Sequence, residues 1–320
     1  MEFAASIDIG GTVTKIALVS SSGVIISRKE LSTQSSQSVK AYFQAIYDQI
    51  DQLLQEQGNP ELAGIGIGAP GCNERLGTIE RTANLLIKEA VPIRDIFARH
   101  YEVPAYLIKD SNAAALGEHL FGGAVDMQNF LLLTLGTGLG CGFFINGQLV
   151  RGEHGLASEL GHITVTPDGR RCGCGRRGCF ETYVSATGIK RTVFELLGRE
   201  LTKSELRHFS FAEMTARHIY EAAGRGDEVA IEAFRRTAEI LALKIADLAA
   251  AFDPEAVFLS GGLAQAGDLL LAPTAAFLDQ QVLYLMKGKI RVLPSQLGAN
   301  DAALLGAASL ALHNQKEKIL

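Results

Sequence analysis

FAASIDIGGTVTKIALV, residues 3–19, predicts a strand, a glycine turn and a second strand. Residues 3–9 are apolar enough to form a buried strand, and GGT at 10–12 is a turn that glycine permits. KIALV at 15–19 resumes the apolar pattern, and a polar SSSG turn then leads into the apolar run VII at 24–26. The chain therefore opens as a β hairpin that continues into further β structure.

The same pattern recurs 126 residues later. Ile-Gly at 9–10 corresponds to Leu-Gly at 135–136, and IALV at 16–19 corresponds to GFFI at 142–145. Hairpins with glycine turns also resemble one another by chance. Two units of this kind in one chain nevertheless favour two similar lobes.

Strand and helix patterns alternate along the rest of the chain, which indicates an α/β layer architecture. Apolar residues at helical spacing predict helices, and short apolar runs that end in glycine or aspartate predict strands. The expected strands are 64–71, 105–110 and 256–262, and the expected helices are 38–58, 92–101, 111–122, 211–224, 227–252 and 301–313.

Composition limits the class of protein. The 320 residues leave room for about two domains, and 47% hydrophobic with 20% charged residues excludes a disordered chain. A net charge of −5 with no long basic run disfavours nucleic-acid binding. No segment is long and apolar enough to span a membrane, and MEFAASIDIGGT lacks the pattern of a signal peptide, so we expect a cytoplasmic protein.

Three glycine turns follow apolar strands, namely DIGGT at 8–12, LGTGLG at 135–140 and SGG at 260–262. Glycine lets backbone N–H groups approach a phosphate, and the hydroxyls of Thr12 and Thr137 add donors. None of these turns is a P-loop or a dinucleotide GxGxxG, and any one alone is typical of an ordinary hairpin. Together, with Asp8 able to hold a hydrated Mg²⁺, they predict a nucleotide held between the lobes.

A cysteine cluster predicts a second kind of site. Cys172, Cys174 and Cys179, with His162 ten residues upstream, supply three thiolates and an imidazole, the donor set of tetrahedral zinc. The alternative is three incidental reduced thiols, which their density within eight residues disfavours. Cys72 and Cys141 lie outside the cluster and are expected in the core.

These motifs, taken in order, resemble those of the actin-like ATPase superfamily and, more narrowly, of the ROK family of bacterial sugar kinases and repressors. The resemblance runs from Ile7 to about Leu310 and rests on DIGGT (8–12), APG (69–71), KDSNAAALGE (109–118), GTGLGCGFFINGQLVRGEHGLASELGH (136–162), CGCGRRGCFE (172–181) and LSGG (259–262).

The resemblance implies a two-lobed actin-like ATPase (ribonuclease H-like) α/β fold with a nucleotide and sugar cleft between the lobes. It implies a small lobe over 1–110, joined by the C-terminal helix 301–320, and a large lobe over 111–300 with the zinc motif and the adenosine loop. It also implies structural zinc on His162 and the three cysteines, and at least a homodimer.

Asp110 is the candidate catalytic base. A sugar hydroxyl is a poor nucleophile, so a kinase needs a carboxylate to accept its proton. Asp110 ends a strand and begins a helix, where α/β enzymes place ligands, but an aspartate there is also a good helix N-cap. The residues alone favour neither role, whereas the resemblance implies the base.

The remaining site residues follow from the resemblance. Lys109 stands where the family usually has asparagine, which puts one hydroxyl contact and the choice of hexose in doubt. The sugar ligands would be Gly71, Asn84, Lys109, Asn112, Glu159, His162 and Glu181. The nucleotide ligands would be Asp8, Gly10, Gly11, Thr12, Lys15, Gly136, Thr137, Gly138, Gly261 and Gly262.

We therefore expect an ATP- and Mg²⁺-dependent hexose kinase acting on the 6-hydroxyl of glucose. N-acetylmannosamine, N-acetylglucosamine and fructose remain open as substrates, and polyphosphate remains open as donor. A ROK-type sugar-responsive repressor is the alternative from another class, but it needs a helix-turn-helix domain before the first glycine turn, and only seven residues precede Asp8. An ATPase of the actin or chaperone kind would have no use for the cysteine cluster or the Asp110 motif.

Overall fold

The computed structural model describes residues 2–34, 36, 38–80, 87–199, 202–298 and 301–313. The chain divides into two compact units. The first comprises Met1–Asp126, Gln148–Ala157 and Gln296–Leu320, and the second comprises Met127–Gly147 and Ser158–Ser295. The expected boundary between a small lobe and a large lobe after residue 110 remains a prediction.

The first unit is built on the N-terminal hairpin. Strands β1 (Phe3–Ile9) and β2 (Val13–Ser20) are antiparallel, and β3 (Ile25–Ser32) extends the sheet beside β2. On the other side of β1 lie β4 (Leu62–Ala69) and β7 (Ala105–Lys109), both parallel to it. A small hairpin, β5 (Cys72–Asn73) and β6 (Thr78–Ile79), follows β4.

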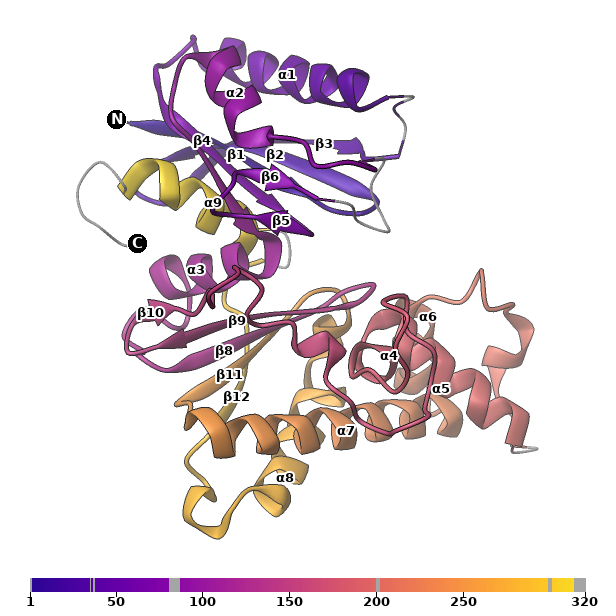
Figure 1. Cartoon of the computed structure of the whole chain (residues 1–320). Helices are drawn as coiled ribbons and strands as arrows, with labels where there is room; N and C mark the ends of the chain where they lie inside the picture. Colours follow the sequence, from indigo (N-terminus) through magenta and orange to yellow (C-terminus); the bar gives the residue numbers. More distant parts are fainter. Residues whose placement is uncertain are drawn as a thin grey trace. The chain divides into compact units, whose positions relative to one another are not determined.

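Helices cover both faces of this sheet (Figure 1). Helices α1 (Val39–Glu56) and α2 (Ile93–Tyr101) pack on one face and enclose the main core of the unit. Helices α3 (Asp110–Phe121) and α9 (Ala302–His313) pack together, and α9 covers the other face. Ser38 begins α1 as an N-cap, since its hydroxyl accepts the N–H of Ala41 at 3.2 Å.

The second unit repeats this arrangement. Strands β8 (Phe130–Leu135) and β9 (Leu139–Ile145) form the second hairpin, followed by the short β10 (Gln148–Leu149) of the first unit. Strands β11 (Ala256–Ser260) and β12 (Arg291–Pro294) continue the sheet parallel to β8. The order β9-β8-β11-β12 thus matches β2-β1-β4-β7. The repeat and the α/β class predicted from the sequence are confirmed.

The helices of the second unit lie mainly between β9 and β11 in sequence. Its α helices are α4 (Glu181–Val184), α5 (Ala186–Arg199), α6 (Ala216–Gly224), α7 (Glu228–Phe252) and α8 (Leu271–Gln281). Its 3₁₀ helices are η1 (Leu160–His162), η2 (Glu205–His208), η3 (Leu263–Leu269) and η4 (Tyr284–Met286). In the described part of the chain, no helix combines the length and apolar character needed to cross a membrane.

One expected helix is wrong at its start. The sequence predicts helix over 211–224, but α6 begins at Ala216. Thr215 is the N-cap, since its hydroxyl accepts the N–H of His218 at 3.2 Å and the backbone N–H of Thr215 donates to the His218 ring at 3.3 Å. Upstream, the Glu213 carboxylate accepts the Ser210 hydroxyl at 2.7 Å, which holds a turn there instead of a helix.

Candidate active site

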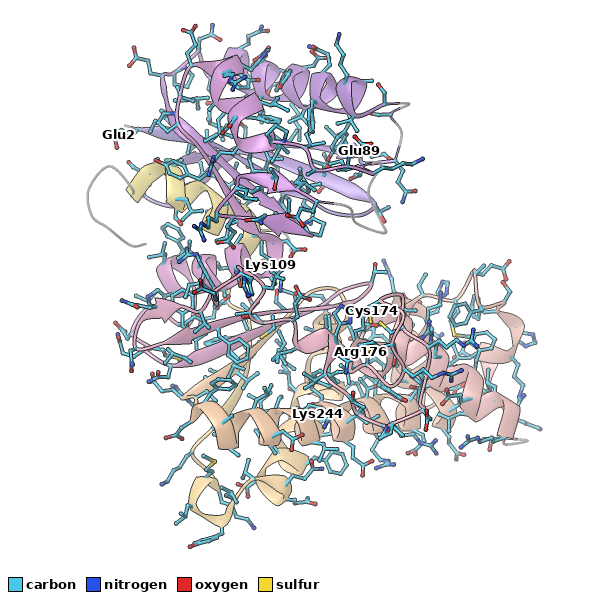
Figure 2. The ribbon with its side chains drawn as sticks, viewed as in Figure 1. Glu2, Glu89, Lys109, Cys174, Arg176 and Lys244 are labelled. Carbon is cyan, nitrogen blue, oxygen red and sulfur yellow. The ribbon has the colours of Figure 1, made fainter. Side chains whose placement is uncertain are left out.

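The junction of β7 and α3 carries the predicted base. Asp110 is the first residue of α3, and Lys109 (labelled in Figure 2) takes the N-cap position without a side-chain cap. The Asp110 carboxylate accepts the N–H of its own neighbour Ser111 at 2.7 Å. Because the N-cap position belongs to Lys109, the N-cap alternative for Asp110 does not describe this turn.

Asp8, at the end of β1, lies within electrostatic reach of Asp110. Lys15 pairs with Asp8 across the β1–β2 hairpin, and the Lys15 Nζ lies 4.0 Å from the Asp8 carboxylate. Burial raises the pKa of Asp8 to about 6, the negative charge of Asp110 raises it further, and Lys15 opposes both. Two neighbouring carboxylates that repel each other suit a hydrated divalent cation, so the Asp8 side chain fits the Mg²⁺ that a kinase requires.

The first glycine turn is held from the end of β3. The Thr33 hydroxyl donates to the Gly10 carbonyl at 2.8 Å, and the Gln34 amide donates to the Gly11 carbonyl at 3.1 Å. Within the turn, the Gly10 N–H donates to the Val13 carbonyl at 3.1 Å. These bonds fix the turn that the sequence predicts for phosphate binding.

The other two glycine turns lie together within the second unit. Gly261, after β11, has φ of +88°, and a Cβ added to it would lie 2.7 Å from the carbonyl oxygen of Leu135 at the end of β8. Only glycine therefore allows this approach without strain. In the β8–β9 turn the Gly136 N–H donates to the Gly138 carbonyl at 3.0 Å.

A cavity of about 360 Å³ opens beside Gly262. Tyr220 is 44% exposed and Phe234 is buried, so an aromatic side chain at the surface and one in the core both border the cavity. Its lining residues come from α6, α7 and η3, and they are Ala216, Arg217, Tyr220, Glu221, Phe234, Gly262, Leu263, Gln265 and Ala266. Sequence analysis missed the helical members, because helix positions of this kind look like an ordinary solvated face.

The cysteine cluster fits a tetrahedral metal. The Sγ atoms of Cys172, Cys174 and Cys179 and a ring nitrogen of His162 lie within 4.8 Å of one another. The Cys174 and Cys179 sulfurs are 3.7 Å apart, and Cys172 Sγ is 3.7 Å from His162 Nδ1. Zinc bound to sulfur at about 2.3 Å gives a tetrahedral edge of about 3.8 Å, so the donors are already spaced for the ion. Cys174 is the exposed member (Figure 2).

Two predicted sugar ligands, Glu159 and Glu181, lie near the same histidine, which is itself a predicted sugar ligand. His162 Nε2 lies 3.9 Å from the Glu159 carboxylate, and His162 Nδ1 lies 3.9 Å from that of Glu181. His162 ends η1 and Glu159 precedes it, as the spacing predicts for a helical turn. A Cβ added to Gly138 would lie 2.7 Å from Glu181 Oε2, so Glu181 borders the predicted phosphate turn.

The remaining predicted ligands belong to the first unit. Gly71 lies in the turn after β4 with φ of +58°. Asn112 is fully buried, and its amide donates to Glu74 at 3.2 Å. Asn84 lies outside the described residues. Sequence analysis missed Glu74 and its ion pair with Arg151 (2.9 Å), because the two residues are 77 positions apart and Glu74 belongs to none of the motifs.

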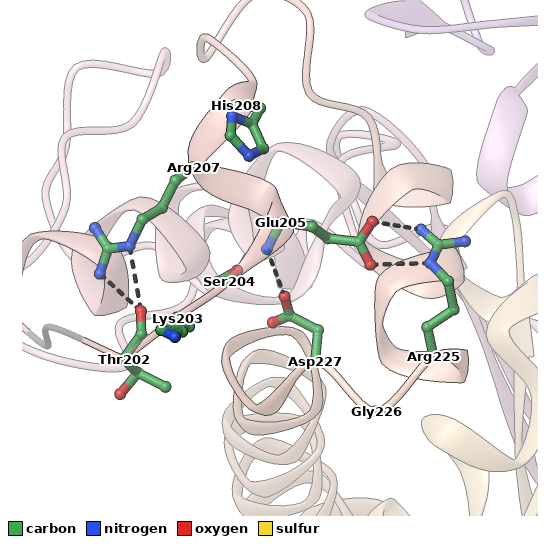
Figure 3. Close-up of a pocket in the computed structure, with 9 residues that line it drawn as sticks. All are labelled: Thr202, Lys203, Ser204, Glu205, Arg207, His208, Arg225, Gly226 and Asp227. Carbon is green, nitrogen blue, oxygen red and sulfur yellow. Dashed lines mark hydrogen bonds and ion pairs between the residues drawn. The ribbon is translucent and has the colours of Figure 1, made fainter.

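A separate hollow of about 640 Å³ is lined by residues 202–204, by residues of η2 and by the α6–α7 turn, none of them predicted site residues (Figure 3). Arg225 pairs with the Glu205 carboxylate through two bonds of 2.9 Å, and the Glu205 N–H donates to Asp227 at 3.0 Å. Arg207 donates to the backbone carbonyls of Thr202 and Leu197. These charged groups hold the local chain together.

Known proteins resemble the whole chain. A glucokinase of Halalkalibacterium halodurans is 34% identical over 95% of this chain and 93% of its own. An N-acetylmannosamine kinase of Shigella boydii is 34% identical over 98% of this chain and 99% of its own. The crystal structure of a ROK family glucokinase from Streptomyces griseus in complex with glucose and AMPPNP superposes with a TM-score of 0.83, at 32% identity over 96% of this chain and 98% of that one.

These similarities also confirm the expected fold, since the chain shares the actin-like ATPase fold of ROK sugar kinases. The model of the ROK family matches residues 4–314, which is nearly the entire chain. The chain therefore belongs to the ROK family.

Proposed function

We propose that the chain is an ATP-dependent hexose kinase that phosphorylates the 6-hydroxyl of glucose. Within the second unit, Glu181 lies between His162 of the cysteine cluster and Gly138 of the phosphate turn, and this arrangement carries the proposal. A group that binds a sugar hydroxyl at the edge of a phosphate site is what phosphoryl transfer to that sugar requires. The similarity to glucokinases along the whole chain supports the same substrate.

Asp110 would accept the proton of the attacking hydroxyl as its oxygen bonds to the γ-phosphorus of ATP. The bond from that phosphorus to the β,γ-bridging oxygen breaks, and ADP leaves with the electron pair. Asp8 would hold the hydrated Mg²⁺, whose charge offsets that of the phosphates. Lys15, Thr12 and Thr137 would add positive charge and donors, beside the backbone of Gly10, Gly11, Gly136 and Gly138.

The adenosine half of ATP would lie in the cavity beside Gly262. The buried ring of Phe234 and the partly exposed phenol of Tyr220 offer an apolar surface with a polar rim, as nucleotide bases prefer. The turn at Gly261 and Gly262 would then lie against the ribose and the first phosphate.

His162, Cys172, Cys174 and Cys179 would hold a structural zinc ion. With Nδ1 of His162 on the cluster side, Nε2 remains directed toward Glu159 and can bind a sugar hydroxyl. The metal would thus brace the side chains that bind the substrate. Gly71, Asn84, Lys109 and Asn112 would supply the other sugar contacts.

The test is ADP release with Mg²⁺-ATP against glucose, fructose, mannose, N-acetylglucosamine and N-acetylmannosamine. Glucose should be preferred, with kcat/KM above about 10⁴ M⁻¹s⁻¹. A preference for N-acetylmannosamine would instead favour the second candidate, which the similarity to N-acetylmannosamine kinase supports. No turnover with ATP or polyphosphate, in a folded protein with zinc bound, would overturn the proposal.

We also propose that the protein is a cytoplasmic homodimer, as its resemblance to the ROK family implies. Light scattering after size exclusion compares the particle mass with that of the 34.2 kDa chain. A monomer at micromolar concentration would contradict this part of the proposal.

A further inference from the structure

A largely enclosed carboxylate outside the predicted site joins three separate segments of the first unit. Glu74 is 11% exposed at its side chain. Its Oε1 accepts the backbone N–H of Lys109 at 3.0 Å and the amide of Asn112 at 3.2 Å. Its Oε2 accepts Arg151 Nε at 2.9 Å. Donors on three sides hold this carboxylate in one orientation.

The backbone that carries Glu74 is itself rigid. Glu74 follows β5 in the β5–β6 hairpin. The Asn73 side chain accepts the Leu76 N–H at 3.1 Å, and the Asn73 carbonyl accepts the Gly77 N–H at 2.8 Å, which closes the turn. Gly77 has φ of +71°, the left-handed conformation that glycine adopts without strain. The side chain of Glu74 therefore projects toward α3 from a fixed base.

The two groups of α3 that Glu74 binds are the ones that a capping box would join. Lys109 is the N-cap residue, and Asn112 is the third residue of the helix. In a capping box the residue at that third position accepts the N-cap N–H, and a lysine at the N-cap has no acceptor to return the bond. Glu74, from a different element, accepts the Lys109 backbone N–H in place of the third residue, and it also accepts the side-chain amide of Asn112.

Asp110 lies between the two anchors that Glu74 provides. The first turn of α3 determines where the Asp110 carboxylate points, and Glu74 fixes that turn through Lys109 and Asn112. Arg151, in the segment that follows β10, neutralises Glu74 and orients its second oxygen. The charge of Glu74 would otherwise be costly in so enclosed a position.

We propose that Glu74 is a positioning residue for phosphoryl transfer and that Arg151 acts through Glu74. This inference rests on the proposed function, because it assigns Asp110 as the base. Glu74 holds the turn that presents Asp110 and Asn112, and takes no part in the proton transfer itself. A misplacement of about 1 Å in a catalytic group can cost about 100-fold in rate, so the effect of its loss should fall on kcat.

The experiment compares Glu74→Ala, Arg151→Ala and the double variant in glucose phosphorylation. Glu74→Ala should lower kcat by about 10- to 100-fold, with the KM for ATP within about twofold of wild type. The double variant should be no slower than Glu74→Ala by more than about twofold, because Arg151 has lost its partner.

Glu74→Gln separates positioning from general structure. Glutamine keeps one oxygen that can accept the Lys109 N–H. Its amide nitrogen replaces the oxygen that accepts from Arg151, so that bond is lost. Its kcat should lie between those of wild type and Glu74→Ala. Glu80→Ala is the matched control, since Glu80 is a carboxylate of the same hairpin that accepts from Asn73 at 3.2 Å, and its kinetics should equal wild type.

The outcomes distinguish the two proposals. An active wild type with Glu74→Ala at wild-type kcat would overturn the positioning role and leave the kinase assignment intact. A lower kcat accompanied by a raised KM for both substrates and a lowered Tm would also overturn the positioning role, because that pattern indicates a folding defect. A wild type that phosphorylates no hexose would overturn the kinase assignment and the positioning role with it.

Discussion

A single substitution can test the proposed role of Asp110 as the catalytic base. Its carboxylate accepts an N–H from Ser111, a bond that the asparagine side chain can also accept. Asp110→Asn should therefore leave Tm close to that of wild type. Without a proton acceptor, kcat with glucose should fall by about 10²- to 10⁴-fold, as measured by ADP release. A variant with more than a tenth of wild-type turnover would show that another group takes the proton.

Asp8 connects stability to pH through its raised pKa. The pKa of Asp8 is about 6 in the folded protein against an ordinary value of 3.8, chiefly because of burial. The folded state therefore binds a proton on Asp8 more tightly than the unfolded state does. The contribution of this proton to the free energy of unfolding is complete below pH 3.8 and is lost as the pH rises through 6. At neutral pH the ionised carboxylate costs at most about 3 kcal/mol.

Asp8→Asn removes that cost and, with it, the proposed Mg²⁺ ligand. In EDTA at pH 7.5 the variant should melt several degrees above wild type, and this difference in Tm should be clearly smaller at pH 4.5. Turnover with Mg²⁺-ATP should be lost at both values. The readout is Tm by calorimetry, with Lys15→Met as a comparison that should lower Tm at pH 7.5, since Lys15 opposes the shift. An equal Tm change at both pH values would contradict the linkage.

The loop over 162–179 carries the donor set of the proposed zinc site. The preparation should contain about one zinc per chain by elemental analysis, and Cys174→Ser should reduce this below about half. Loss of zinc should raise the KM for glucose more than that for ATP, because His162 lies 3.9 Å from both Glu159 and Glu181. Cys141→Ala is the control, since Cys141 is buried in β9 away from the cluster. Zinc below about half per chain in the wild type would reject the metal site.

Long elements could be predicted from the sequence because their apolar periodicity is unambiguous. Helix α7 (Glu228–Phe252) follows the predicted range 227–252, with Asp227 as a cap whose side chain accepts the Ala230 N–H at 3.0 Å. The start of α6 could not be predicted, because the apolar spacing continues through a turn that Ser210 and Glu213 hold by side-chain bonds. Two-residue strands such as β5 and β6 are too short to show a period.

Some residues of the candidate site could likewise be predicted from the sequence, and others could not. Motifs within one short stretch, such as the cysteines at 172–179, could be located because their chemistry and spacing coincide. Glu74 could not, because its role depends on Lys109 and Arg151, which are 35 and 77 residues away. A carboxylate in a polar turn is expected to be solvated, and only the folded unit brings Lys109, Asn112 and Arg151 to it.

At the scale of the whole molecule, the first unit is assembled from distant parts of the chain. The chain leaves this unit after Asp126 and after Ala157, and re-enters it at Gln148 and at Gln296. Glu118, fully buried at the end of α3, accepts the N–H of Gly123 at 2.8 Å and that of Gln296 at 3.0 Å. The Glu118 carboxylate thus holds the segment where the chain first leaves the unit and the segment where it enters the unit for the last time. The C-terminal helix then completes the unit that carries Asp110.

Gly306 tests whether that last helix supports the site. A Cβ at Gly306 of α9 would lie 1.8 Å from the Ala113 carbonyl, in the same helix as Asp110. Glycine to alanine inside a helix normally stabilises by about 1 kcal/mol, but here the backbones of α3 and α9 would have to separate. Gly306→Ala should therefore lower both Tm and kcat with glucose. Gly198→Ala in α5, where nothing lies within 4 Å, is the matched control and should raise Tm slightly. If both variants were stabilised, the close packing of α9 on α3 would not support the catalytic turn.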